Sequence, residues 1–325
     1  MSVTRWTVLV LSLIVVMVAG VAIGTINLSL AAVWHGAFGV GDTTTVYIVR
    51  ALRLPRVVLA LLVGAGLGMS GAALQGTMRN PLAEPYLLGV SGGAAVGAVL
   101  ATVLGLAVSL LPLAAFVGAV VAVVIAFFVA HAAGGGTRGD PRTLLMAGVV
   151  VGAFANAAIM VLLARAPANT VQDAMWWMMG SAADATWSRV GALAAYMLVG
   201  GGALVLLGRR IDVLALGEDA AAGLGLAVDA AIRLVFLVAS FVAAATVAAA
   251  GLVGFVGLVV PHIVRAIGVR QHRALIIGSA LVGGMLVVLS DLLGRILLPP
   301  AELPLGAVTA LIGVPFLLTK LRRLT

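Results

Sequence analysis

The side chains of Asp291 and Arg295 form the most conspicuous ionisable pair in this sequence, because both lie near one end of a long apolar run. Residues four apart on a helix share a face, so the two groups can form an ion pair. A carboxylate inside a membrane can also carry a proton or a sodium ion, although such relays generally combine several carboxylates or histidines. The sequence favours the ion pair and leaves the carrier role open.

Nucleotide hydrolysis and metal binding find little support among the other residues. Lys320 is the only lysine, and no Gly-x-x-x-x-Gly-Lys-Ser/Thr motif includes it, so the chain is not a P-loop ATPase. The lack of cysteine excludes disulfides and thiolate metal sites. His262 follows Pro261, where we expect a helix to be interrupted, and it has no second histidine nearby. We therefore predict no catalytic, cofactor-binding or metal site, and no enzymatic activity for the chain itself.

Two segments carry polar residues or prolines that an ordinary membrane span would not need. Arg53 and Arg56 flank Pro55 in a basic cluster, and guanidinium groups pair bidentately with carboxylates. The cluster suits docking of an acidic partner, with contact to lipid headgroups as the alternative. Residues 79–85 contain two prolines, which break a helix, so this segment predicts a turn whose simplest interpretation is an ordinary tight loop.

The stretch DVLALGEDAAAGLGL, at residues 212–226, predicts two short amphipathic helices within a loop. An aspartate at its start can cap the first helix, and Gly217 can end it. The adjacent Glu218 and Asp219 can begin the second helix, which would end at Gly223 or Gly225. Two such helices offer a surface that another protein can grip, while a solvated loop is the alternative.

The composition requires lipid as the solvent for these segments. Of 325 residues, 63% are hydrophobic and 9% charged, whereas a soluble domain carries roughly 25% charged residues. The length fits ten helices of about 20 residues each in one transmembrane domain spanning residues 1–325. The net charge of +8 is scattered between apolar runs, which argues against nucleic acid as a partner. The N-terminal apolar run is too long for a signal peptide, so we expect it to be retained.

Ten apolar stretches predict an all-α membrane protein. They are continuous and lack period-two alternation, which favours helices over a barrel, and two long runs are broken at 109–112 and 251–257. The expected spans are residues 8–30, 56–75, 86–106, 110–131, 143–164, 190–208, 229–250, 253–270, 274–294 and 304–320. Placing both termini in the cytoplasm puts 13 of the 19 basic residues inside, in agreement with the positive-inside rule.

Several stretches, in order, resemble the FecCD family of ABC-importer permeases, which includes the cobalamin, ferric-siderophore and heme importers. The matching stretches are LRLPR (52–56), GAALQGTMRNPLAEPYLLGVSGGAAVGA (71–98), MWWMMGS (175–181), LALGEDAAAGLG (214–225), AGLVGFVGLVVPHIVR (250–265) and SDLLGRILLPPAELPLGAVTALIGVPF (290–316). A long ordered set is far more specific than a lone glycine motif. The resemblance implies a bundle like that of the cobalamin-importer permeases, although the first span and the 131–142 loop match only in character.

The resemblance also implies roles for individual residues. Arg53, Arg56 and Arg295 occupy positions that receive acidic side chains of an external binding protein, and Asn80 and Leu82 fall where the family narrows its cytoplasmic gate. A second gate segment would lie near Pro141-Arg142, but these two positions lack the small hydroxyl residues of the family. The residues of the implied segment that couples to the ATPase are Asp212, Leu214, Gly217, Glu218, Asp219 and Gly223.

Taken together, the resemblance implies the permease of an ATP-driven importer in the cytoplasmic (inner) membrane of a bacterium or archaeon. Its partners would be a second copy of itself, two ATP-binding cassette subunits that hold the ATP and Mg, and a periplasmic or lipid-anchored substrate-binding protein. The cargo would be a metal chelate moved by alternating access, with a ferric siderophore placed first and cobalamin or heme as alternatives. The rival hypotheses are an ion-coupled secondary transporter that uses Asp291 and a non-transporting membrane scaffold.

Overall fold

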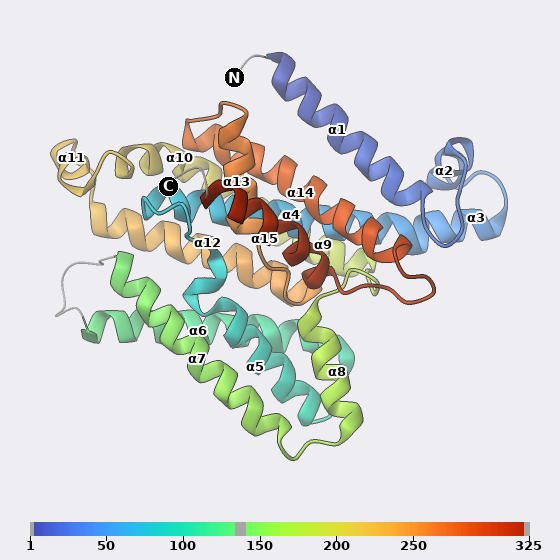
Figure 1. Ribbon diagram of the computed structural model, residues 1–325, viewed down its shortest axis with the longest axis horizontal. Coiled ribbons are helices and arrows are strands. Elements are labelled where there is room, and N and C mark those ends of the chain that lie inside the picture. The colour runs from blue at the N-terminus through green and yellow to red at the C-terminus, as the bar shows by residue number, and fades with distance from the viewer. Residues whose placement is uncertain (1–2, 134–140, 322–325) are drawn as a thin grey trace.

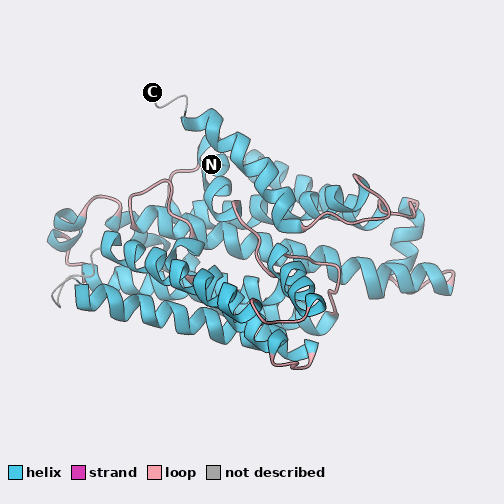
Figure 2. Ribbon diagram, turned by 60° about the horizontal axis from the view of Figure 1, so that its bottom comes forward, coloured by secondary structure: helices cyan, strands magenta, loops and turns pink. Residues whose placement is uncertain are grey.

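The described chain consists of helices joined by short connections (Figures 1 and 2). The computed structural model describes residues 3–133 and 141–321. The α-helices are α1 (Val3–Ala22), α2 (Leu30–Ala37), α3 (Thr43–Tyr47), α4 (Leu54–Thr77), α5 (Val90–Val103), α6 (Leu111–Ala133), α7 (Pro141–Leu163), α8 (Ala168–Met179), α9 (Trp187–Tyr196), α10 (Gly202–Leu214), α11 (Glu218–Gly223), α12 (Val228–Ala250), α13 (Val256–Ala266), α14 (His272–Ile296) and α15 (Leu305–Leu321). Shorter turns are the π-helical η1 (Ile48–Arg53) and η4 (Met197–Gly201) and the 3-10 helical η2 (Pro85–Leu88) and η3 (Val108–Leu110).

The helices reproduce the ten predicted spans in order. Within residues 3–133 and 141–321, seven helical stretches are long and apolar enough to cross a membrane: Val3–Ala22, Thr43–Thr77, Val108–Ala133, Thr143–Leu163, Trp187–Leu214, Val228–Ala250 and His272–Ile296. The three other predicted spans correspond to the shorter apolar helices α5, α13 and α15. The prediction of an all-α membrane protein with about ten spans is therefore confirmed.

The first predicted span, over 8–30, is wrong at its C-terminal end. Helix α1 ends at Ala22, and a new helix begins only after Ser29, which caps α2. The carbonyl groups at the end of α1 accept hydrogen bonds from Arg53 and Arg295, so the helix need not continue to satisfy them. An apolar pattern cannot reveal this ending, because the donors come from distant parts of the chain.

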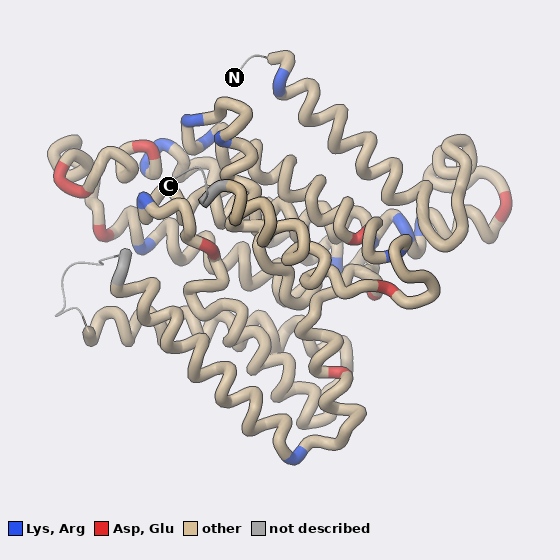
Figure 3. The backbone as a smooth tube through the Cα atoms, in the orientation of Figure 1, with Lys and Arg blue, Asp and Glu red and all other residues tan. Residues whose placement is uncertain are grey.

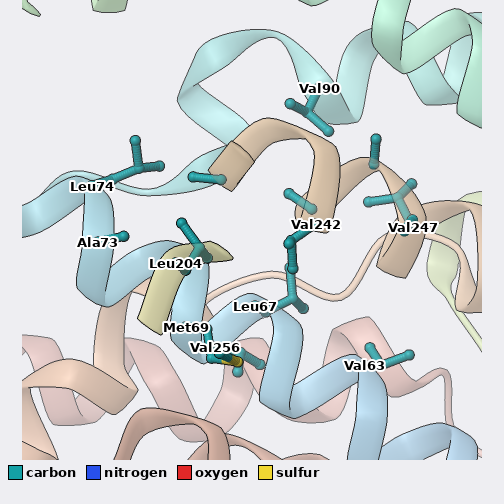
Figure 4. Packing of buried hydrophobic residues seen from close by; sticks show 14 of the residues in the cluster. Val63, Leu67, Met69, Ala73, Leu74, Val90, Leu204, Val242, Val247 and Val256 are labelled. Carbon is teal, nitrogen blue, oxygen red and sulfur yellow. The ribbon is translucent and has the colours of Figure 1, made fainter. Parts of the chain in front are cut away.

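Helices α4 and α14 pack with their backbones in direct contact. A Cβ atom on Gly64 would collide with the Gly283 carbonyl, and one on Gly283 with the Gly64 carbonyl. Gly68 meets the carbonyl of Ser279 in the same way. Small residues of this kind allow close backbone packing in lipid, where the hydrophobic effect does not drive helix association. Next to this contact, buried side chains of α4, α5, α10, α12 and α13 fill the core (Figure 4).

Helices α5 and α13 begin inside the bundle rather than at one of its ends. Gly71, within α4, faces the carbonyl of Gly257 at the start of α13, and Pro85 packs against the same glycine. The segments that precede the two helices, residues 78–89 and 251–255, run outside α-helices and enter the bundle at the buried Ala83, Pro85, Leu88 and Val253. In membrane proteins such backbone is tolerated where it is buried in protein or lines a water-filled cavity. The break predicted at 251–257 is confirmed.

Pro261 lies inside α13 without interrupting it, which corrects the sequence-based expectation. Proline has no N–H, so the carbonyl of Gly257, four residues earlier, lacks its usual intrahelical donor. The side-chain amide of Gln75 on α4 donates to this carbonyl at 3.2 Å and to that of Leu258 at 3.1 Å. Its amide oxygen accepts from Arg265 at 2.7 Å. A side chain of a neighbouring helix thus completes the hydrogen bonding of α13.

Charged residues gather mainly towards two opposite ends of the bundle (Figure 3). We call the end that holds Arg53, Arg56 and Arg295 the arginine end, and the opposite one the α11 end. Helix α1 begins, and α15 ends, towards the α11 end (Figure 1). This arrangement is the one expected of an even number of crossings.

Candidate functional site

Two of the three predicted docking arginines are buried in the structure. Arg53 and Arg295 are only 8% and 7% exposed. Arg53 donates to the carbonyl of Val21 at 2.8 Å, and Arg295 donates to that of Gly20 at 2.9 Å. Both guanidinium groups therefore hold the end of α1 in this conformation instead of forming an open basic surface. For these two residues docking stays a prediction, and it requires a conformational change.

Asp291 lies at the centre of an ion-pair cluster at the arginine end. Its carboxylate oxygens lie 2.9 Å from Arg56 Nη2 and 3.2 Å from Arg295 Nε, and the residue is 4% exposed. The pairing with Arg295, predicted from the spacing of four residues, is confirmed. Both carboxylate oxygens are thus engaged by guanidinium groups of the same chain, which favours a structural role for Asp291 over that of an ion carrier.

Glu302 is a member of this cluster that the sequence analysis missed. Arg56 Nη1 and Nη2 donate to its two carboxylate oxygens at 3.0 and 2.8 Å, a bidentate pair. These hydrogen bonds from Arg56 lower the pKa of Glu302 from its ordinary value of 4.5. The carboxylate is therefore ionised at neutral pH, and the pair is lost only as the pH falls below that ordinary value. Arg56 already holds a carboxylate of its own chain, and the Glu302 side chain is 43% exposed.

An open cavity of about 720 Å³ lies beside the ion-pair cluster. Its volume falls in the range of small-molecule sites. Helix α8, which the hydropathy pattern did not predict, contributes two indole rings to the wall. The charged and aromatic residues that line the cavity are Arg56, Asp173, Trp176, Trp177, Asp184, Arg189, Asp291 and Glu302.

The predicted gate residues Asn80 and Leu82 lie in residues 78–89, which we call the gate loop. Asn80 Oδ1 accepts from the backbone N–H of Leu82 at 2.9 Å, as in a turn led by an asparagine. The Leu82 side chain is 47% exposed, so it is free to contribute to an apolar constriction of the kind that gates pores. The expected turn is present, with the N–H of Ala83 donating to the Asn80 carbonyl at 3.1 Å, and the chain returns into the bundle after Leu82. Whether these residues form a gate stays a prediction.

Helix α11 begins where the sequence analysis predicts it. Gly217, with φ +112°, ends the preceding helical stretch in a conformation that favours glycine, and Glu218 starts α11. Ala221 is fully buried and seats the short helix on the rest of the chain, while Leu216 and Leu224 on either side of it are about two-thirds exposed. Exposed leucines of this kind mark a protein-binding surface when they are grouped.

Asp212 and Leu214 do not belong to a separate short helix, which corrects the prediction of two such helices. Both lie in the last turn of α10, which follows α9 and η4 without a break. Asp212 Oδ1 instead accepts from the backbone N–H of His272 at 2.9 Å and lies 2.7 Å from its Nδ1. Asp212 therefore caps α14 rather than a helix of its own segment.

The predicted second gate segment lies largely outside the described residues. Helix α7 begins at Pro141, but residues 134–140 and the side chains of Pro141 and Arg142 fall outside the part that the structure describes. A gating role there stays a prediction. Within the described residues, no group of three or more His, Cys, Asp or Glu side chains is placed to hold a metal ion.

Comparisons with known proteins agree with one another. A family model described as the FecCD transport family matches residues 12–323. The cobalamin import system permease protein BtuC of Halobacterium salinarum is 43% identical over 88% of this chain and 76% of its own. The Fe(3+)-citrate import system permease protein YfmE of Bacillus subtilis is 34% identical over 97% and 93%. A solved inward-facing structure of an ABC transporter assigned to the metal-chelate type superposes with a TM-score of 0.89 at 28% identity, covering 98% of this chain and 99% of that one.

Proposed function

Because this chain belongs to the FecCD transport family, we propose that it passes a metal chelate across the cytoplasmic membrane from an external binding protein by alternating access. The observation that carries the proposal is the placement of two different surfaces at opposite ends of one bundle. The arginine end has an ion-pair cluster beside a cavity of about 720 Å³. The α11 end has a short helix flanked by exposed leucines.

In the proposed assembly two copies of the chain form the pore. Helix α11 seats on the ATP-binding cassette subunits in the cytoplasm, which places both termini on the cytoplasmic side, and the binding protein docks at the arginine end. One relative is named for the import of cobalamin and another for the import of ferric citrate, which supports a metal chelate as the class of cargo. We place a ferric siderophore first, with cobalamin and heme as alternatives.

Reconstitution tests this function. Proteoliposomes that contain the chain with its cognate ATPase subunits and binding protein are expected to accumulate the chelate in the presence of ATP and Mg. No accumulation is expected without ATP, whatever proton or sodium gradient is applied. Uptake driven by an ion gradient in the absence of the ATPase would support the rival secondary transporter instead. The absence of any flux with all partners present would support a scaffold.

Replacing Glu302 by Gln is expected to strengthen docking of the binding protein about two- to fivefold, the value of one exposed ion pair. The substitution removes the exposed one of the two carboxylates that pair with Arg56 and leaves the buried Asp291 in place, so an incoming acidic side chain no longer competes with Glu302. Arg56→Glu is expected to weaken docking in the same assay. Affinity is measured by surface plasmon resonance on the solubilised transporter.

Glu302→Asp serves as the matched control for this prediction, because it keeps the competing charge. Unchanged affinity in both Glu302→Gln and Arg56→Glu would contradict docking through Arg56. The proposed importer would then need another contact for its binding protein.

A further inference from the structure

The gate loop and residues 251–255, which we call the inner segment, touch each other inside the bundle. The backbone N–H of Phe255 donates to Glu84 Oε1 at 3.1 Å, and that of Val253 donates to the hydroxyl oxygen of Tyr86 at 3.0 Å. Nearer the α11 end, the carbonyl of Pro81 lies 2.9 Å from His262 Nε2 on α13. Three side chain–backbone contacts thus join the gate loop to the inner segment and to the helix that follows it.

The gate loop also reaches helix α11. Arg79, the residue before Asn80, has a left-handed backbone with φ +50°. Its Nη2 lies 3.7 Å from Glu218 Oε1 on α11, and its side chain lies beside Gly217. This exposed ion pair connects α11 to a residue adjacent in sequence to the predicted gate.

The inner segment, in turn, reaches the cavity at the arginine end. Gly251 packs against the carbonyl of Trp177 and the backbone of Gly180, both of which line the cavity. The N–H of Ser181 donates to the carbonyl of Ala250 at 2.8 Å, and the N–H of Leu305 donates to that of Gly180 at 3.0 Å. The end of α8 and the start of α15 are therefore held to the inner segment by backbone contacts.

The hydrogen bonds between the gate loop and the inner segment are costly to break. The backbone N–H groups of Val253 and Phe255 have their acceptors on the gate loop, and separating the two segments would leave both N–H groups without these acceptors. An unsatisfied backbone N–H in an apolar interior costs several kcal/mol. The two segments are therefore expected to move together.

We propose that Glu84 and Tyr86 are positioning residues that transmit the movement of α11, through the inner segment, to the cavity at the arginine end. The proposal rests on the proposed function, because it needs an ATPase that moves α11. Each side chain acts through one backbone hydrogen bond, so the coupling depends on acceptor atoms and not on the charge of Glu84.

Conservative variants separate this role from a simple need for packing. Tyr86→Phe removes one oxygen atom, and Glu84→Leu removes the acceptor, whereas Glu84→Gln retains an oxygen that can accept from Phe255. Ser70→Ala is the matched control, because it removes a buried hydrogen bond from α4 to the Ala239 carbonyl, away from both segments. The natural sequence contains no cysteine, so Ser181→Cys introduces a single thiol probe at the wall of the cavity.

The experiment uses the reconstituted complex with its ATPase subunits and binding protein. It records uptake per ATP hydrolysed, and the change in maleimide labelling of Ser181→Cys when the complex is trapped with ATP and vanadate. Tyr86→Phe and Glu84→Leu are expected to keep ATP hydrolysis within about twofold of the parent, to lower uptake per ATP by roughly 5-fold or more, the scale of an allosteric coupling energy, and to lose the labelling change. Glu84→Gln and Ser70→Ala are expected to behave like the parent.

Each alternative result has a distinct meaning. A full labelling change in Tyr86→Phe and Glu84→Leu, or an equal loss in Ser70→Ala, would overturn the transmission role while leaving the importer intact. Loss in Glu84→Gln as well as Glu84→Leu would overturn the acceptor mechanism. If the parent complex itself shows no ATP-driven uptake, the proposed function fails, and the inference fails with it.

Discussion

Removal of the coupling helix, residues 218–223, is expected to abolish uptake while ATP hydrolysis continues. In the proposed assembly α11 is the surface through which the ATPase subunits move the permease. An isolated helix of six residues is not stable in water, so α11 depends on the buried Ala221 and on its partners for its form. Without it, uptake per ATP is expected to fall on the order of 100-fold, near the upper end of measured coupling free energies. The measurement is chelate uptake and phosphate release in the same proteoliposomes.

The control for this deletion keeps the length of the chain. A variant in which a six-residue Gly/Ser linker replaces residues 218–223 removes the helix without shortening the connection between α10 and α12. It is expected to be as uncoupled as the deletion, because the helix and not the tether carries the contact. Normal coupling in the linker variant would mean that α11 is a solvated loop, and the ATPase would have to act elsewhere on the permease.

Replacing Asp291 by Asn is expected to destabilise the folded protein by about 3–5 kcal/mol, the cost of breaking a buried ion pair by removing one partner. Arg56 and Arg295 both pair with this carboxylate, and Arg295 is itself buried. Neutralising Asp291 leaves positive charge at the arginine end without its buried counter-charge. The measurement is the denaturant midpoint of the detergent-solubilised protein.

Glu302→Gln is the matched control for Asp291→Asn, because it neutralises a carboxylate on the same Arg56. Its side chain is 43% exposed, so its loss is expected to cost at most about 1 kcal/mol. Equal destabilisation by both variants would contradict the central place of Asp291. The uptake that remains in Asp291→Asn is expected to depend on ATP. Dependence on an ion gradient, abolished by this substitution, would instead favour the secondary transporter.

The spans could be predicted from sequence because each is a continuous apolar run, and lipid imposes one requirement on all of them. Helix α8 could not, since Gln172 and Asp173 lie within it and lower its hydropathy below that of a span. The Asp291–Arg295 pair was predictable because both residues lie on one helix. Glu302 was not, because its partner Arg56 is 246 residues away.

The same distinction separates the parts of the candidate site. The start of α11 depends on Gly217 and its neighbours, so local rules were sufficient. The partner of Asp212 is His272, on another helix, and no local rule reaches it. The burial of Arg53 has the same cause, because three carbonyls that it bonds belong to the end of α1 and the turn after it.

The hydrogen bonds from Gln75 to α13 imply an order in which the helices of this membrane protein are synthesised and packed. Gln75 and Leu258 are 183 residues apart in the chain, and synthesis runs from the N-terminus. When α13 is synthesised, the carbonyl of Gly257 has no hydrogen-bond donor within its own helix, because Pro261 has no N–H. The hydrocarbon core of the bilayer contains no water that could replace this donor. The side-chain amide of Gln75, which donates to this carbonyl, has already been synthesised at that point. Helix α13 is therefore expected to reach its final structure only when it packs against α4, and part of its stability depends on this earlier helix.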